Sequence, residues 1–122
     1  MRISEEIISE CRRKLLLMRE ELMNRMRSNK LEVTAHEKMA GDEADQTQAQ
    51  ITENQFAVNQ ARIRNQLLEV DYALARIQQG KFGVCEETEE PIEIERLLAI
   101  PFTRLSIEGA EIRESLLKVY AR

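Results

Sequence analysis

Two long runs of heptad-spaced apolar residues constrain the fold of this chain more than any other feature. In the first run, over residues 3–29, these residues are Ile8, Cys11, Leu15, Met18, Leu22 and Met26. In the second, over residues 45–79, they are Phe56, Ile63, Leu67, Val70, Leu74 and Ile77, with polar Gln60 at one seam position. Neither run contains glycine or proline, so each predicts a long helix with one apolar face.

The break between the two runs is short and contains Gly41, Asp42 and Asp45. The apolar period weakens after Leu31, and Thr34 already favours an end to the first helix. Asp45 is a suitable N-cap for the second helix. We therefore expect an antiparallel coiled-coil hairpin over residues 1–79, with its tip near residues 40–47. The tip half of the second helix is rich in Gln, Asn and Thr, which predicts weaker packing there.

Residues 80–122 have a different character. Gly80 is the expected C-cap of the second helix. Residues 81–85 and 91–94 are predicted as two short strands, and residues 106–120 as a helix that Ser106 caps. The fold class is therefore mainly α, with a small second domain made of a short β-hairpin and a C-terminal helix.

Composition and charge exclude several classes of function. The net charge of −4 does not indicate non-specific binding to nucleic acid. No apolar run approaches the roughly 20 residues that span a bilayer, and acids occupy the N-terminus where a signal peptide needs apolar residues, so a cytoplasmic protein is expected. The sequence contains no nucleophile–base pair, P-loop or metal cluster, so no enzyme is predicted.

Several short motifs resemble the DksA/TraR family. Residues 80–85 (GKFGVC), 91–92 (PI) and 96–101 (RLLAIP) resemble its C-terminal zinc-finger region. The hairpin resembles the family's coiled coil, and Asp42 and Asp45 match the two acids of its tip motif D-x-x-D-x-A. Thr47 replaces the alanine of that motif. The resemblance covers almost the whole chain and implies a coiled coil with a zinc-finger-like domain.

The family's four zinc-ligand positions are occupied here by Cys85, Thr88, Ser106 and Gly109. A structural zinc takes four Cys or His ligands in a tetrahedron, so we expect no metal. Thr88 and Ser106 can instead share a hydrogen bond, while Cys11 is expected too far along the coiled coil to serve as a ligand. Packing must then replace a metal worth on the order of 10 kcal/mol. The side chains expected to pack are Phe82, Val84, Ile94, Leu97, Ile100, Phe102, Leu105, Ile112 and Leu116.

The resemblance implies a bacterial transcription regulator that binds RNA polymerase through its secondary channel. Asp42, Asp45 and Thr47 would then lie near the active centre and modulate initiation in the stringent response. The family positions associated with the alarmone (p)ppGpp read Glu69, Ile100 and Ala110. A phosphate ligand needs Lys or Arg, so weak alarmone coupling is expected. A monomer is expected, with neither sequence-specific nucleic-acid binding nor membrane attachment.

Two other functions suit the same pattern. A Gre-like stimulator of transcript cleavage would use the tip acids to hold a catalytic metal. A plain coiled-coil adaptor would have no polymerase role, and Asp42 and Asp45 would then simply cap the loop-to-helix junction.

Overall fold

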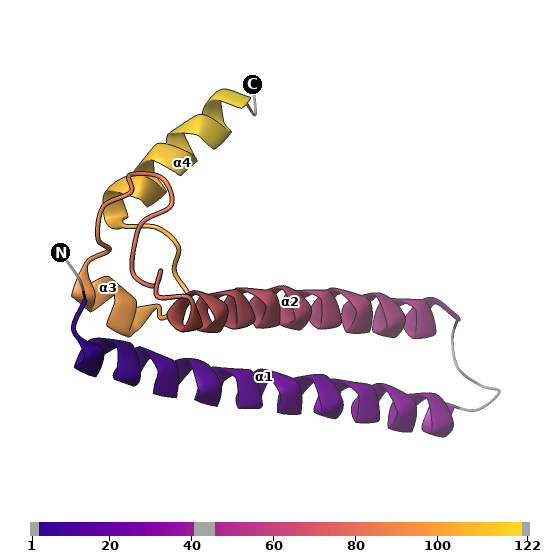
Figure 1. Ribbon diagram of the computed structural model, residues 1–122. Coiled ribbons are helices and arrows are strands. Elements are labelled where there is room, and N and C mark those ends of the chain that lie inside the picture. The colour runs from indigo at the N-terminus through magenta and orange to yellow at the C-terminus, as the bar shows by residue number, and fades with distance from the viewer. Residues whose placement is uncertain (1–2, 41–45, 121–122) are drawn as a thin grey trace. The chain divides into compact units, whose positions relative to one another are not determined.

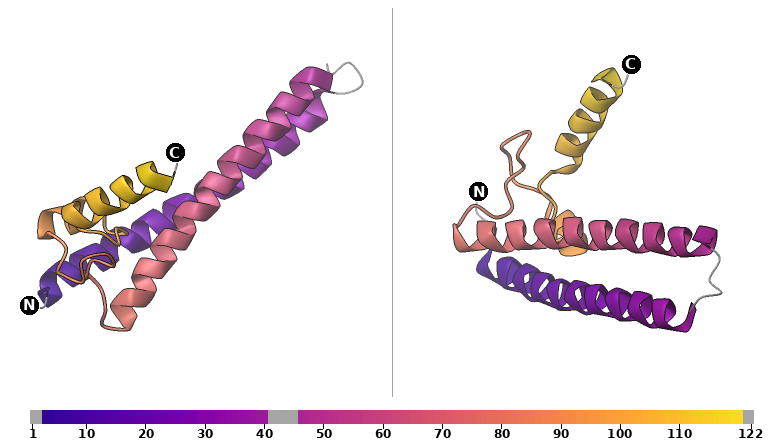
Figure 2. Two further views of the ribbon diagram at one scale, coloured as in Figure 1. Left: turned by 90° about the horizontal axis from the view of Figure 1, so that it is seen from above. Right: turned by 90° about the vertical axis from the view of Figure 1, so that its right-hand side faces the viewer.

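The computed structural model describes the backbone of residues 3–40 and 46–120, and the side chains of residues 3–35 and 47–120. In chain order its helices are α1 (Glu5–Ala40), α2 (Gln46–Gln78), α3 (Ile94–Ala99) and α4 (Ile107–Tyr120). Helices α1 and α2 lie side by side and run in opposite directions (Figures 1 and 2). The mainly α fold class and the antiparallel helical pair are therefore as predicted.

The two long helices have simple sequence determinants. Helix α1 has 36 residues and ends later than predicted, because no glycine or proline precedes residue 41 and Thr34 Oγ1 donates to the Lys30 carbonyl at 2.9 Å within the helix. Helix α2 has 33 residues, and each end lies within one residue of the prediction. It ends at Gln78, and Gly80 just beyond it has a φ of 74°, in the left-handed region that favours glycine. There the Lys81 N–H donates to the Arg76 carbonyl at 2.9 Å.

The chain divides into two compact units. Unit 1 comprises residues 1–17 and 69–122, and unit 2 comprises residues 18–68. Within unit 1, the buried residues on the facing sides of α1 and α2 include Leu15 and Val70. Within unit 2, the described residues that are buried are Leu22 and Ile63. All of these belong to the predicted seam, so the heptad pattern correctly predicted these buried positions.

The core of unit 1 joins both cysteines. One cluster in this core has Cys11, Cys85, Ile92 and Leu97 as its buried members, with Ile3, Ile7, Phe82, Leu98 and Leu105 packed around them. The expectation that Cys11 lies far along the coiled coil is wrong, since its thiol donates to the Leu97 carbonyl at 3.7 Å. Four residues that were expected to pack are instead substantially exposed: Val84, Ile94, Ile112 and Leu116.

The predicted β-hairpin is reduced to one isolated antiparallel bridge between Val84 and Pro91 in the part of the chain that the structure describes. The Ile92 N–H donates to the Gly83 carbonyl at 2.8 Å. Gly83 has φ of 87° and packs against Ile3, so the backbone turns where a strand would continue. Helix α3 then begins at Ile94, which was predicted as strand.

Helix α4 was predicted correctly, including its N-cap. Ser106 Oγ accepts a hydrogen bond from the Gly109 N–H at 3.0 Å. Glu93 carboxylate oxygens also accept the Ile107 N–H, the nearer at 3.1 Å. These contacts fix the start of α4 inside unit 1.

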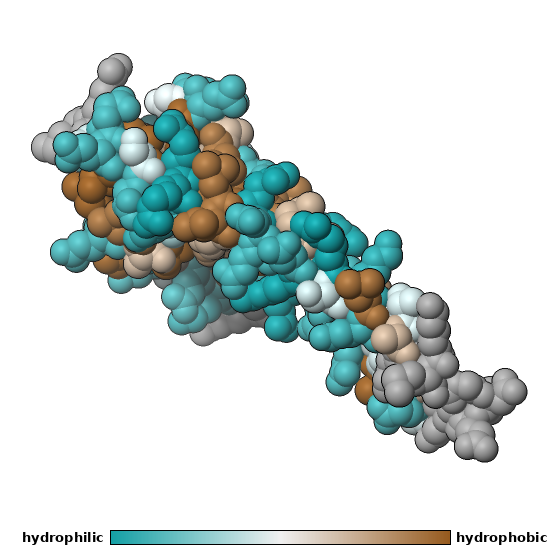
Figure 3. Space-filling model, turned by 90° about the horizontal axis from the view of Figure 1, so that it is seen from below, coloured by the Kyte–Doolittle hydropathy of each residue, from teal (hydrophilic) through white to brown (hydrophobic). Residues whose placement is uncertain are grey.

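Figure 3 shows hydrophilic residues over much of the visible face, with hydrophobic residues in separate groups between them. Among residues 3–40 and 46–120, no helix combines the length and apolar character that a bilayer crossing needs.

Candidate functional site

The predicted tip is only partly within the described residues. Asp42 and Asp45 lie outside them, and Thr47 is exposed in the first turn of α2. Helix α1 ends at Ala40 and α2 begins at Gln46, so the acid pair belongs to the connection between the two helices.

The second predicted set comes together in space around one sulfur. Cys85 is buried at 1% exposure, and both Thr88 and Ser106 donate hydrogen bonds to its Sγ through hydroxyl and backbone groups. A Cβ added at Gly109 would collide with this sulfur. The structure therefore brings all four predicted positions together, and the Thr88 and Ser106 hydroxyls hydrogen-bond to Cys85.

These hydrogen bonds change the acidity of the thiol. Burial raises the pKa of Cys85, but the Ser106 and Thr88 side-chain and backbone donors together outweigh it and lower the pKa from 9.0 to about 6. Cys11 differs, because burial raises the pKa of its thiol. At neutral pH the pocket thus stabilises a thiolate at Cys85 and a neutral thiol at Cys11.

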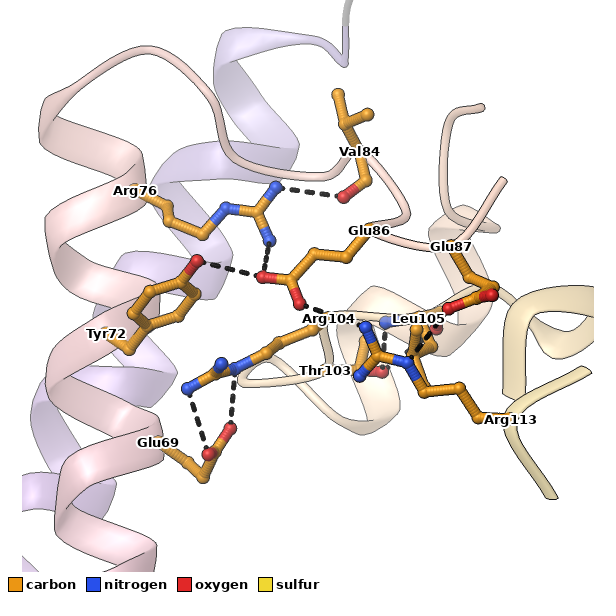
Figure 4. A network of polar contacts seen from close by, with 10 residues as sticks. All are labelled: Glu69, Tyr72, Arg76, Val84, Glu86, Glu87, Thr103, Arg104, Leu105 and Arg113. Carbon is orange, nitrogen blue, oxygen red and sulfur yellow. Dashed lines mark hydrogen bonds and ion pairs between the residues drawn. The ribbon is translucent and has the colours of Figure 1, made fainter. Parts of the chain in front are cut away.

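A polar network centred on Glu86 joins α2, the loop after Cys85 and α4 (Figure 4). Glu86 accepts a hydrogen bond from the Tyr72 hydroxyl at 2.8 Å and pairs with Arg76 at 3.6 Å. Its other oxygen pairs with Arg113 of α4 at 3.5 Å, while Arg113 also binds Glu87 at 3.1 Å. The ion pair with Glu87 raises the pKa of Arg113. These contacts attach α4 to the end of α2.

A second connection lies beside the first. Nε and Nη2 of Arg104 each donate to a carboxylate oxygen of Glu69 at 3.0 Å (Figure 4). This is the bidentate geometry that makes Arg–carboxylate pairs specific. The Cζ atom of the same guanidinium lies 3.7 Å from the centre of the Tyr72 ring.

None of the three positions that the resemblance associates with an alarmone, Glu69, Ile100 and Ala110, carries a basic side chain. Glu69 is already bound by Arg104. Ile100 is the residue that ends α3, and Ala110 lies in α4. Arg96, a cation close by in sequence, donates to the Leu105 carbonyl at 2.8 Å.

Residues 80–115 match the family model described as the prokaryotic dksA/traR C4-type zinc finger. The RNA polymerase-binding transcription factor DksA of Caulobacter vibrioides is 30% identical over 109 residues, which cover 89% of this chain and 77% of that protein. The chain belongs to the DksA/TraR family.

Solved structures in this family have the same fold. The transcription factor DksA2 from Pseudomonas aeruginosa matches with a TM-score of 0.86 and 32% identity, covering 94% of this chain and 88% of that one. The regulator Dks from Chlamydia trachomatis matches with a TM-score of 0.56 and 20% identity, a likeness of fold alone.

The description of the family's finger as C4-type implies a zinc ion held by four cysteines. The residues at the four corresponding positions of this chain do not fit such a zinc site. The position of a fourth thiolate is Gly109, whose missing side chain leaves room for the Cys85 sulfur itself. Thr88 and Ser106 hydrogen-bond to that sulfur, and their hydroxyls are not the Cys or His ligands that a structural zinc takes. Within the described residues, no group of three or more Cys, His, Asp or Glu is placed to hold a metal.

Sequence reasoning did not identify the polar network. Glu69 and Arg104 are 35 residues apart, and Glu86 and Arg113 are 27 apart. No local spacing reveals such pairs, because they depend on where the loops fold. The glutamate-rich stretch at residues 86–95 was the available signal, and charge alone does not distinguish Glu86 from its exposed neighbours.

Proposed function

We propose that this protein is a transcription regulator that binds RNA polymerase through the secondary channel and works without zinc. In this proposal Asp42 and Asp45 approach the polymerase active centre at the end of the α1–α2 pair. The protein shifts a conformational equilibrium of polymerase during initiation by binding its states with different affinity, so it need not catalyse a reaction. It acts as a cytoplasmic monomer, without sequence-specific contacts to nucleic acid.

One observation carries the proposal. A curated DksA that binds RNA polymerase is 30% identical over 89% of the chain, and the DksA2 structure aligns over 94% of it. The likeness therefore includes both long helices and not only the finger region. The two tip acids lie on the connection between these helices, as the family motif requires.

The zinc-free part of the proposal rests on the Cys85 pocket. Zinc in a small finger joins the loop to the helix that follows. Here the Cys85 sulfur, its donors Thr88 and Ser106, and the notch at Gly109 make that connection directly. Arg113 adds ion pairs between the loop and α4.

Weak coupling to (p)ppGpp is part of the same proposal. Polyphosphate binding needs unpaired Arg or Lys groups. The Glu69 carboxylate is negatively charged, as a phosphate is, so the two repel each other. Its pairing with Arg104 also occupies the guanidinium beside it. We expect (p)ppGpp to increase the effect of this protein less than it does for a relative with basic residues at those positions.

The experiment that tests the function is in vitro transcription at a ribosomal RNA promoter, combined with a polymerase-binding assay. Asp42→Asn and Asp45→Asn are expected to bind polymerase but lose the effect on initiation. Glu53→Gln, which neutralises an exposed acid on α2, is the matched control and should leave both properties intact.

Three outcomes would contradict the proposal in different ways. Absence of binding to core polymerase by the unsubstituted protein would favour a coiled-coil adaptor. Stimulated cleavage of backtracked transcripts, lost in the tip variants, would favour Gre-like activity. Loss of binding in the tip variants alone would make Asp42 and Asp45 docking residues instead.

A further inference from the structure

Gln60 is a polar residue in the middle of the apolar seam of unit 2. It follows Phe56 by four residues and precedes Ile63 by three, so it faces α1 within this unit. Its amide oxygen Oε1 is buried and accepts no hydrogen bond from the described part of the chain. A buried amide oxygen without a donor is destabilising, because water would satisfy it in the open state.

The packing of unit 2 changes at Gln60. Among the described residues of unit 2, Leu22 and Ile63 are buried, and both lie on the same side of Gln60 along the helical pair. We call residues 23–35 of α1 and 47–62 of α2 the distal segment. Every side chain in it is at least partly exposed. Apolar burial therefore stabilises the distal segment less than it stabilises the level of Leu22 and Ile63.

A groove separates the two helices in the distal segment. It has a volume of about 360 Å³, and Val33 of α1 and Phe56 of α2 lie on its walls. The other lining residues are polar, four of them carboxamides: Asn29, Gln48, Gln55 and Asn59. A groove of this kind admits water between the helices, so opening exposes little further apolar surface.

We propose that Gln60 is a built-in weak point that lets the distal segment open and close while the remainder of the seam stays packed. The free-energy cost of opening is low, because hydration of Gln60 Oε1 offsets part of the lost packing. Local opening of this kind belongs to the low-stability parts of native proteins. A polar residue at a seam position is a known way to trade stability for another property.

Hydrogen exchange on the full-length protein tests this, read by mass spectrometry or NMR. In the unsubstituted protein, distal amides should exchange at least tenfold faster than amides of residues 70–78. Gln60→Leu should slow the distal amides about tenfold and leave residues 70–78 unchanged. Gln60→Glu should accelerate distal exchange, because the buried charge is costlier than the amide.

Gln66→Leu is the matched control, since Gln66 is exposed on the same helix. It makes the same chemical change without filling the seam, so no amide should change its exchange rate. The proposal is overturned if Gln60→Leu leaves distal exchange unchanged, or if it slows residues 70–78 by the same factor. It is also overturned if distal amides of the unsubstituted protein are as protected as residues 70–78.

Discussion

The Cys85 sulfur occupies the space that a Cβ at residue 109 would need, so Gly109 and Cys85 are a complementary pair. Ser106 belongs to the same arrangement, because its hydroxyl accepts from the Gly109 N–H and donates to Cys85. The first turn of α4 is thus packed directly on the Cys85 sulfur.

Gly109→Ala is expected to destabilise the protein by about 1–3 kcal/mol, the usual cost of overpacking a tight site. The sign is diagnostic, because replacing glycine by alanine inside a helix ordinarily stabilises by about 0.5–1 kcal/mol. Urea unfolding followed by circular dichroism measures the difference. A stabilised variant would mean that the sulfur is not held against Gly109.

The Cys85 thiolate makes stability depend on pH between about 6 and 9. In the folded protein the pKa of Cys85 is about 6, against an ordinary value of 9.0. Between these values the unfolded chain binds the proton and the folded chain does not, so stability rises with pH. The contribution is complete above pH 9 and is lost as the pH falls through 6.

Unfolding free energies of the unsubstituted protein and Cys85→Ser, measured under reducing conditions from pH 5.5 to 8.5, give this dependence by difference. The unsubstituted protein should gain up to about 1.4 kcal/mol per pH unit relative to the variant. Cys11→Ser is the control, because the pKa of Cys11 is raised and its thiol stays neutral across this range. Parallel curves for the unsubstituted protein and Cys85→Ser would refute a thiolate.

The Arg104–Glu69 pair is expected to stabilise the protein more than an ordinary surface pair. Arg104 is bidentate and also stacks on Tyr72, and these features add to the Coulomb attraction. A double-mutant cycle with Arg104→Met and Glu69→Gln should give a coupling of about 1 kcal/mol. The equivalent cycle for Arg25 and Glu21, an exposed pair on α1, should give less than about 0.5 kcal/mol. Equal couplings would contradict a special role for Arg104.

Local pattern was enough to predict much of this fold. The seam residues Leu15, Leu22, Ile63 and Val70 are buried as predicted, and the turn at Gly80 and the cap at Ser106 were also predicted correctly. All of these depend on residues near each other in sequence. The β-hairpin over residues 81–94 was predicted wrongly. Gly83 turns the backbone where it packs against Ile3, and this contact joins distant parts of the chain.

The candidate site divides in the same way. The family motif predicted that four positions would lie together, namely Cys85, Thr88, Ser106 and Gly109. The hydrogen bonds from Thr88 and Ser106 to the Cys85 sulfur did not follow from the motif, since they depend on the position of Sγ. Arg104 and Arg113 could not be assigned partners from sequence, because several glutamates in residues 86–95 were equally plausible.

Metal removal gives the clearest contrast with four-cysteine members of the family. If the Cys85 pocket replaces zinc, EDTA should leave the unfolding midpoint and the helical signal of this protein unchanged. A four-cysteine relative treated in parallel should lose stability, because a structural zinc contributes directly to folding. Purified protein carrying one zinc per chain, or unfolding of residues 80–122 on chelation, would show that Cys85 has recruited ligands the sequence does not suggest. An unchanged midpoint together with a chelator-resistant effect on transcription would instead mean that thiolate hydrogen bonds and the Gly109 notch suffice to hold α4 in place.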